Sequence, residues 1–61
     1  MRVDELAMQI ENGSGIVSGD RRVQIYSDLI FSDQVPRQRL EQLRVSYPKA
    51  YELALDARGC G

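Results

Sequence analysis

Hydrophobic residues recur at intervals of three and four positions in the first segment of the chain, at Val3, Leu6, Ala7 and Ile10. This spacing places them on one face of a helix over residues 2–12. Acidic residues in the first turn of that segment suit the positive end of a helix. The Asn12-Gly13 pair predicts a helix stop in which the backbone turns into the left-handed region.

A glycine-rich connection follows, and the segment after it fits two secondary structures. A helix over residues 21–31, capped by Ser18 or Asp20, gathers one apolar face from Val23, Tyr26, Leu29 and Ile30. In a strand, the other face would consist of polar positions except Ile30, and one face would be formed by Val23, Ile25, Ser27, Leu29 and Phe31. The length of the segment favours the helix. A short hairpin or ribbon around residues 16–27 stays open as the alternative.

Two prolines divide the second half of the chain. Pro36 suits the first turn of a helix, which continues at helical spacing through Leu40, Leu43 and Tyr47. Pro48 ends that helix and permits another one over residues 49–58. This last segment has a small face that lets a second helix approach closely, made of Ala50, Ala54 and Ala57.

These segments predict an all-α fold, a small bundle of three to four short helices in a single domain over residues 1–58. The alternative is an α+β fold containing the hairpin or ribbon. Residues 59–61 are expected to form a flexible tail after a stop at Gly59. Cys60 in that tail is interpreted as a solvated free thiol, or alternatively as a modifiable thiol or an intermolecular disulfide.

Composition and size change the picture in one respect. The chain has 61 residues, of which 43% are hydrophobic and 28% charged, which fits a folded domain better than a disordered one. A chain this short has a small core, and its single cysteine forms no internal disulfide. Burial against another chain is the remaining source of stability, so we expect a binding function.

The sequence offers no group suited to catalysis. There is no histidine, and the carboxylates fall mostly on polar helix faces. No Gly-x-Ser-x-Gly motif is present, and the glycines at 13–15 and 19 lack the lysine and spacing of a phosphate loop. We therefore expect no enzyme, no catalytic residue, no cofactor, no metal and no small-molecule substrate. Because no apolar run spans a bilayer and no signal peptide is evident, we expect a cytoplasmic protein without membrane contact.

Nucleic acid is the alternative partner. Residues 33–58 have the outline of a helix-turn-helix, but its second helix offers only Lys49 and Arg58 against two acids. A ribbon-helix-helix arrangement would present Arg22, Gln24 and Tyr26 to a groove. A small dimeric DNA-binding regulator is thus the second hypothesis.

Protein binding is the first hypothesis, because aromatic residues and arginine commonly anchor interfaces. The predicted protein-binding residues are Phe31, Arg37, Arg39, Arg44 and Tyr47. Tyr26 and Tyr51 are expected to be mostly buried. The partner would be a second copy of the chain or a larger host protein. The function would be that of a regulator, either an inhibitor or an adaptor, of bacterial or phage origin.

One stretch carries a family resemblance. The pattern Arg2-Val3-x-x-Leu6-x-x-x-Ile10-x-Asn12-Gly13 resembles the helix and Asn-Gly step in the sigma-binding region of the FlgM-type anti-sigma factors. The resemblance covers residues 2–30. It implies a second amphipathic helix that ends in an apolar pair. It also implies contact with a sigma factor through Leu6, Ile10, Leu29 and Ile30, which otherwise belong to the core.

Overall fold

The computed structural model describes residues 3–59, which form four helices and no strand. The helices are α1 (Val3–Asn12), α2 (Arg21–Ile30), α3 (Arg37–Ser46) and α4 (Pro48–Gly59). The expected all-helical bundle is confirmed, and the hairpin or ribbon around residues 16–27 is wrong.

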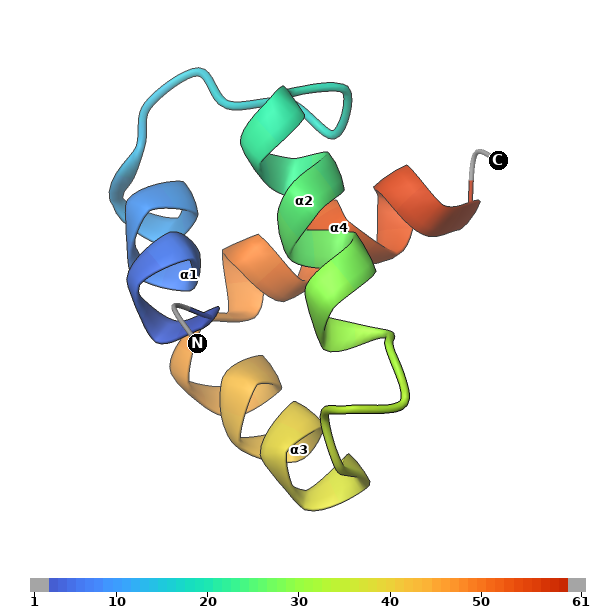
Figure 1. The fold of residues 1–61 in the computed structure, drawn as a ribbon. Coiled ribbons are helices and arrows are strands. Elements are labelled where there is room, and N and C mark those ends of the chain that lie inside the picture. The colour runs from blue at the N-terminus through green and yellow to red at the C-terminus, as the bar shows by residue number, and fades with distance from the viewer. Residues whose placement is uncertain (1–2, 60–61) are drawn as a thin grey trace.

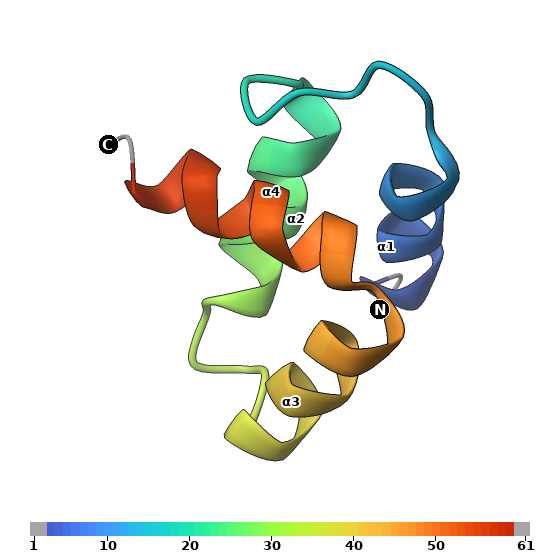
Figure 2. The same cartoon turned by 180° about the vertical axis from the view of Figure 1, so that it is seen from behind.

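The helix α4 holds the bundle together. It packs against each of the other three helices, whereas α3 packs mainly against α4. In Figure 1, α1 and α2 lie side by side and α4 crosses behind α2. Figure 2 shows the same helix from behind, lying across the bundle with α3 at one end. The face formed by α1 and α2 on the side away from α4 is therefore left without a covering helix.

The side chains of α2 explain why this segment is a helix. Its buried residues follow the helical period and comprise Val23, Tyr26, Ser27 and Ile30. A strand would have buried Ile25 together with Val23, yet 47% of Ile25 is exposed. The carboxylate of Asp20 caps the helix by accepting a hydrogen bond of 2.9 Å from the Arg22 N–H.

The hydrophobic core has a small volume, because many of the side chains in it are short. In the described part of the chain, the buried hydrophobic residues are Val3, Ala7, Ile10, Val23, Tyr26, Ile30, Leu43, Ala50 and Ala54. The predicted small face of α4 is thus largely buried, and α2 packs closely on it. There the Ser27 hydroxyl donates a hydrogen bond of 3.0 Å to the carbonyl oxygen of Ala54.

The first turn of α4 is capped from a distant part of the chain. The Glu11 carboxylate, at the end of α1, accepts a hydrogen bond of 2.8 Å from the backbone N–H of Ala50. A carboxylate at a helix N-terminus satisfies an N–H without an intrahelical partner and is favoured by the helix dipole. This contact ties α1 to α4.

Three details differ from the sequence-based expectations. Gly13 does not adopt the left-handed conformation, which the backbone takes instead at Gly15, where φ is 75°. A side chain at Gly13 would collide with that of Ile16 and lie 2.9 Å from the Gln9 carbonyl oxygen, so close packing requires the glycine. Pro36 is the N-cap of α3 and not part of its first turn. The last helix includes Gly59; the rest of the predicted tail, with Cys60, lies outside the described residues.

Candidate protein-binding surface

One side of α2 faces α4, and the opposite side carries hydrophobic residues. The hydrogen bond from Ser27 to Ala54 marks the side that meets α4. Because successive residues are about 100° apart on a helix, Leu29 lies about 160° around the helix from Ser27. Ile25 is one turn before Leu29 on the same side. Leu29 is half-buried, whereas nearly half of Ile25 is exposed.

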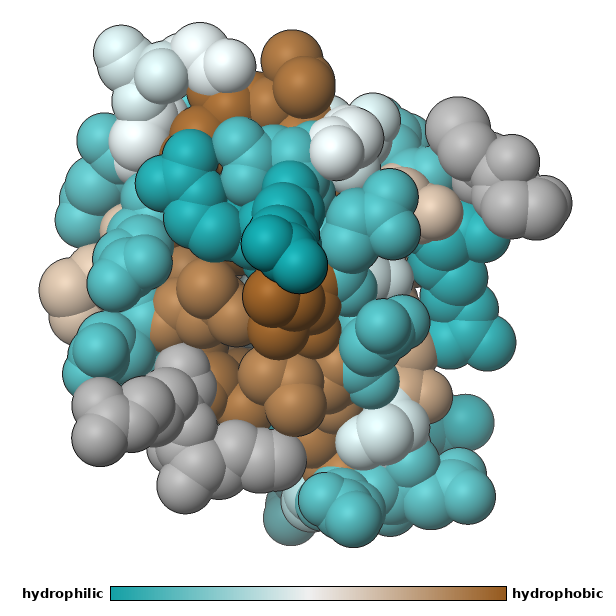
Figure 3. All heavy atoms as spheres, turned by 45° about the horizontal axis from the view of Figure 1, so that its top comes forward, coloured by the Kyte–Doolittle hydropathy of each residue, from teal (hydrophilic) through white to brown (hydrophobic). Residues whose placement is uncertain are grey.

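The neighbouring helix α1 adds a third hydrophobic residue to this side. Its contact with α4 is marked by Glu11, and Leu6 lies about 140° around the helix from Glu11. Leu6 is half-buried and packs against the edge of the core. We call Leu6, Ile25 and Leu29 the apolar seam. Figure 3 shows hydrophobic side chains gathered in the middle of this face, with polar and charged ones around them.

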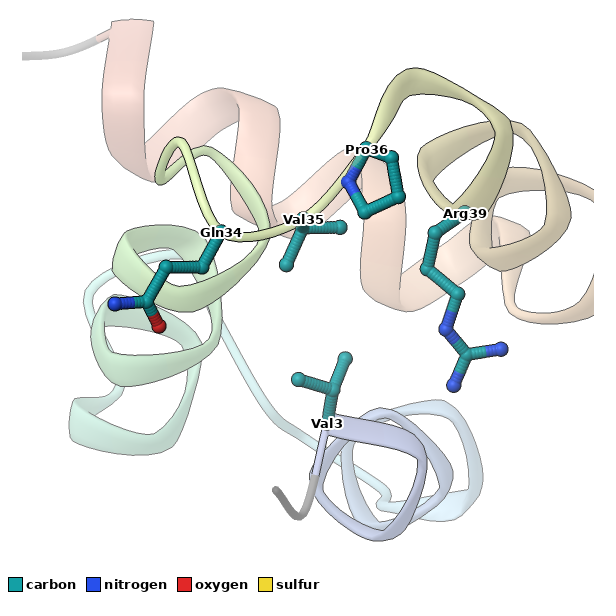
Figure 4. Close-up of a pocket in the computed structure, with 5 residues that line it drawn as sticks. All are labelled: Val3, Gln34, Val35, Pro36 and Arg39. Carbon is teal, nitrogen blue, oxygen red and sulfur yellow. The ribbon is translucent and has the colours of Figure 1, made fainter.

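A hollow of about 230 Å³ lies between the start of α1 and the segment that leads into α3. Its lining residues are Val3, Gln34, Val35, Pro36 and Arg39. In Figure 4, the side chains of Val3, Val35 and Pro36 surround the hollow, and Arg39 extends along one side. Apolar walls of this kind take an aliphatic side chain, and the guanidinium can bind a carboxylate or carbonyl oxygen beside it.

The three arginines predicted to bind a partner do not form one basic face. Arg39 points toward α1, where its guanidinium makes an ion pair of 2.5 Å with Asp4. Arg44 pairs with Glu41 at 2.9 Å, and this hydrogen bond holds the pKa of the Glu41 carboxyl below its usual value. Arg37 is exposed and lies two helical turns before Arg44 on the same side of α3.

The two predicted aromatic residues lie in different places. Phe31, the C-cap of α2, has its ring centroid 6.0 Å from that of Tyr51, and the Arg58 guanidinium lies 4.8 Å above the Phe31 ring. Tyr47 lies at the junction between α3 and α4. All three aromatic side chains are partly exposed. Tyr51 also packs against the core, which agrees with the expectation that most of its side chain is buried.

Tyr26 is the largest fully buried side chain of the described core. Its hydroxyl oxygen has no hydrogen-bond partner among the described residues. Burial raises the pKa of this phenol to about 12, and the negative charges of Asp4 and Glu11 add to the shift. The phenol stays protonated at neutral pH, so Tyr26 is a structural residue and offers no base for catalysis.

Comparison with protein-family models, with curated proteins and with solved structures gives no match to this chain. Within residues 3–59, no set of three or more histidine, cysteine or carboxylate side chains is placed to hold a metal ion. None of the four helices is long and apolar enough to cross a membrane.

The structure distributes the residues of the anti-sigma resemblance between two environments. Ile10 and Ile30 are completely buried, whereas Leu6 and Leu29 belong to the apolar seam. Sequence reasoning did not single out Ile25 or the hollow. The signal for Ile25 was present, since it lies off the stripe formed by Val23, Tyr26 and Ile30. The hollow depends on how distant segments meet, and no local pattern reveals it.

Proposed function

We propose that this chain is a non-enzymatic regulatory protein that binds another protein through the apolar seam and the adjoining hollow. The observation that carries the proposal is the seam itself. Ile25 is 47% exposed and Leu6 and Leu29 are half-buried, on the face that no helix of the described chain covers. A contiguous apolar patch rimmed by polar residues is typical of interaction sites.

The energetics of a small domain support this interpretation. Only large side chains contribute strongly to a core, and three of the nine buried hydrophobic residues in the described part are alanines. Complete burial of a residue such as isoleucine stabilises by roughly 1.5–3 kcal/mol, of which Ile25 realises only a part in the free chain. Covering the seam would add the remainder.

The hollow beside the seam supplies the specificity that a flat apolar surface lacks. Buried anchor side chains in pockets contribute most of the energy of many interfaces. An aliphatic anchor can enter between Val3, Val35 and Pro36, and Arg39 can bind a polar group next to it. A role as an inhibitor or adaptor in the cytoplasm is consistent with this mode of action and belongs to the proposal.

Affinity capture with matched variants tests the proposal. The purified chain is immobilised and exposed to a lysate of the cells that make it, in wild-type form, as Ile25→Glu and as Val45→Glu. Val45 is the control because it is a 72% exposed β-branched residue on α3, outside the seam. We expect the same protein to bind to the wild type and Val45→Glu and to be lost with Ile25→Glu. Retention by Ile25→Glu, or no bound protein with any form, would contradict the proposal.

A DNA-binding function remains the second proposal. Its supporting observation is that Arg37 and Arg44 are both exposed on one side of α3, where Glu41 pairs with Arg44. Its test is a titration of duplex DNA at low salt, with Arg37→Glu as the variant. Binding that falls steeply with salt and with Arg37→Glu, yet survives Ile25→Glu, would favour DNA over protein as the partner.

A further inference from the structure

The outermost stripe of α2 consists of Arg21, Ile25 and Asp28. These residues are spaced by four and three positions and therefore lie on one line along the helix. All three are exposed, and the line runs opposite to the buried Val23 and Ile30. An isoleucine thus occupies the centre of the solvent-facing stripe, with a positive charge one turn before it and a negative charge one turn after it.

These two charges are placed against the helix dipole. Acidic residues usually occupy the first turn of a helix and basic residues the last, but α2 has no acid in its first turn and no base in its last. Arg22 in the first turn is paired with Asp20 at 3.1 Å. The side chains of Arg21 and Asp28 have no hydrogen bond or ion pair with any residue in the described range 3–59. Asp28 lines a small hollow together with Arg58 of α4, but no ion pair joins these two side chains.

The stripe is complementary to itself when a second copy is reversed. A two-fold axis beside Ile25 lies halfway between Arg21 and Asp28 along the helix. Antiparallel packing about this axis brings Arg21 of each chain opposite Asp28 of the other, with the two Ile25 side chains in contact between them. Two ion pairs and one apolar contact result, and each charge then faces an opposite one.

We propose that the partner bound at this surface is a second copy of the chain, with α2 packed antiparallel against α2 of that copy. This inference rests on the proposed function and names its partner. The outer stripe forms the centre of the dimer interface, and it shares Ile25 with the apolar seam, to which Leu29 also belongs.

Charge exchange tests this geometry. Sedimentation equilibrium is measured from about 10 μM to about 1 mM, a range that covers weak dimers. We expect the wild type to dimerise and both Arg21→Glu and Asp28→Arg to weaken dimerisation about tenfold, because each single change turns two attractions into two repulsions. An equimolar mixture of the two variants should form heterodimers, since every facing pair is then attractive. The double variant should also dimerise. Arg37→Glu on α3 is the control and should behave as the wild type.

The melting temperature shows whether a variant fails to dimerise because it is unfolded. Both single changes place charges in agreement with the dipole of α2, so at the lowest concentration the melting temperature should not fall. A wild type that stays monomeric throughout, or a mixture that associates no better than its components, would overturn the inference. If the wild type is monomeric but a different protein is captured through Ile25, the proposed function stands and only the dimer fails. If Ile25→Glu captures that protein as well as the wild type does, both the proposed function and the dimer fail.

Discussion

Replacing Tyr26 by phenylalanine should stabilise the protein. The side chain is completely buried, and its hydroxyl has no hydrogen-bond partner among the described residues. Burial of an unsatisfied hydroxyl costs about 1–3 kcal/mol, and the substitution removes that group while keeping the ring. We expect the free energy of unfolding to rise by about 1 kcal/mol. In a domain of this size, such a change raises the melting temperature by roughly 4–8 °C.

The same substitution should change the dependence of stability on alkaline pH. The phenol of Tyr26 has a pKa raised to about 12 in the folded chain, against 10.0 when it is solvated. Above pH 10 the unfolded state therefore releases this proton while the folded state retains it. Stability falls as pH rises through this window, and the full shift of about two units corresponds to about 2.7 kcal/mol. Tyr26→Phe lacks this contribution, so its advantage over the wild type should grow between pH 10 and 12.

Urea denaturation followed by circular dichroism measures both effects, at pH 7 and at intervals from pH 9 to 11.5. Because the two proteins share every other ionisable group, the difference in stability between them isolates the contribution of Tyr26. A loss of about 1 kcal/mol or more at pH 7 would show that the hydroxyl is hydrogen-bonded and refute the reasoning about burial. A difference that does not change with pH would refute the raised pKa.

Three other substitutions test how the helices are joined and capped. Glu11→Ala should lower the free energy of unfolding by about 1 kcal/mol in urea denaturation, because α4 loses its cap, whereas Glu11→Gln keeps an acceptor oxygen and should lose less. Gly13→Ala should cost about 1–3 kcal/mol in the same assay, because the new methyl group displaces the side chain of Ile16. Hydrogen bonds from Arg22 lower the pKa of the Asp20 carboxyl from 3.8, so the stability it contributes is complete above that pH and is lost as the pH falls below it. Acid titrations of the wild type and Asp20→Asn should therefore converge below pH 3.8, and parallel curves would exclude the effect.

The spacing of hydrophobic residues predicted the helices, and the capping residues, glycines and prolines predicted most of their boundaries. Val23, Tyr26 and Ile30 are buried at the spacing that favours a helix, and Asp20 is the cap. The competing strand pattern shared Val23 and Leu29 with the helix but required Ile25 to be buried, whereas 47% of Ile25 is exposed. Periodicity alone could not decide this, since either face of the segment contains enough hydrophobic residues to be buried.

The contacts that the sequence did not reveal join residues far apart in the chain. The Glu11 cap of α4 spans 39 positions, and the pair of Arg39 with Asp4 spans 35. Both depend on the angle at which α1 meets the other helices, which no local pattern specifies. The grouping of three arginines on one short segment suggested a basic surface. In the folded chain the acids of α1 and α3 pair with two of them.

The size of an ordinary interface explains why the charges on the outer stripe of α2 affect the binding of any partner at this surface. The chain has an accessible surface of 4236 Å², and a standard interface covers about 800 Å² of each partner, roughly a fifth of this surface. Along the helix, Arg21 is only about 6 Å from Ile25, and Asp28 is nearer still. An interface of that size centred on Ile25 necessarily covers both charges. A partner with an uncharged face would leave them desolvated without a counter-charge, which opposes binding. For a partner that covers this surface, we therefore expect an acid and a base about two helical turns apart in reverse order, as in α2 itself.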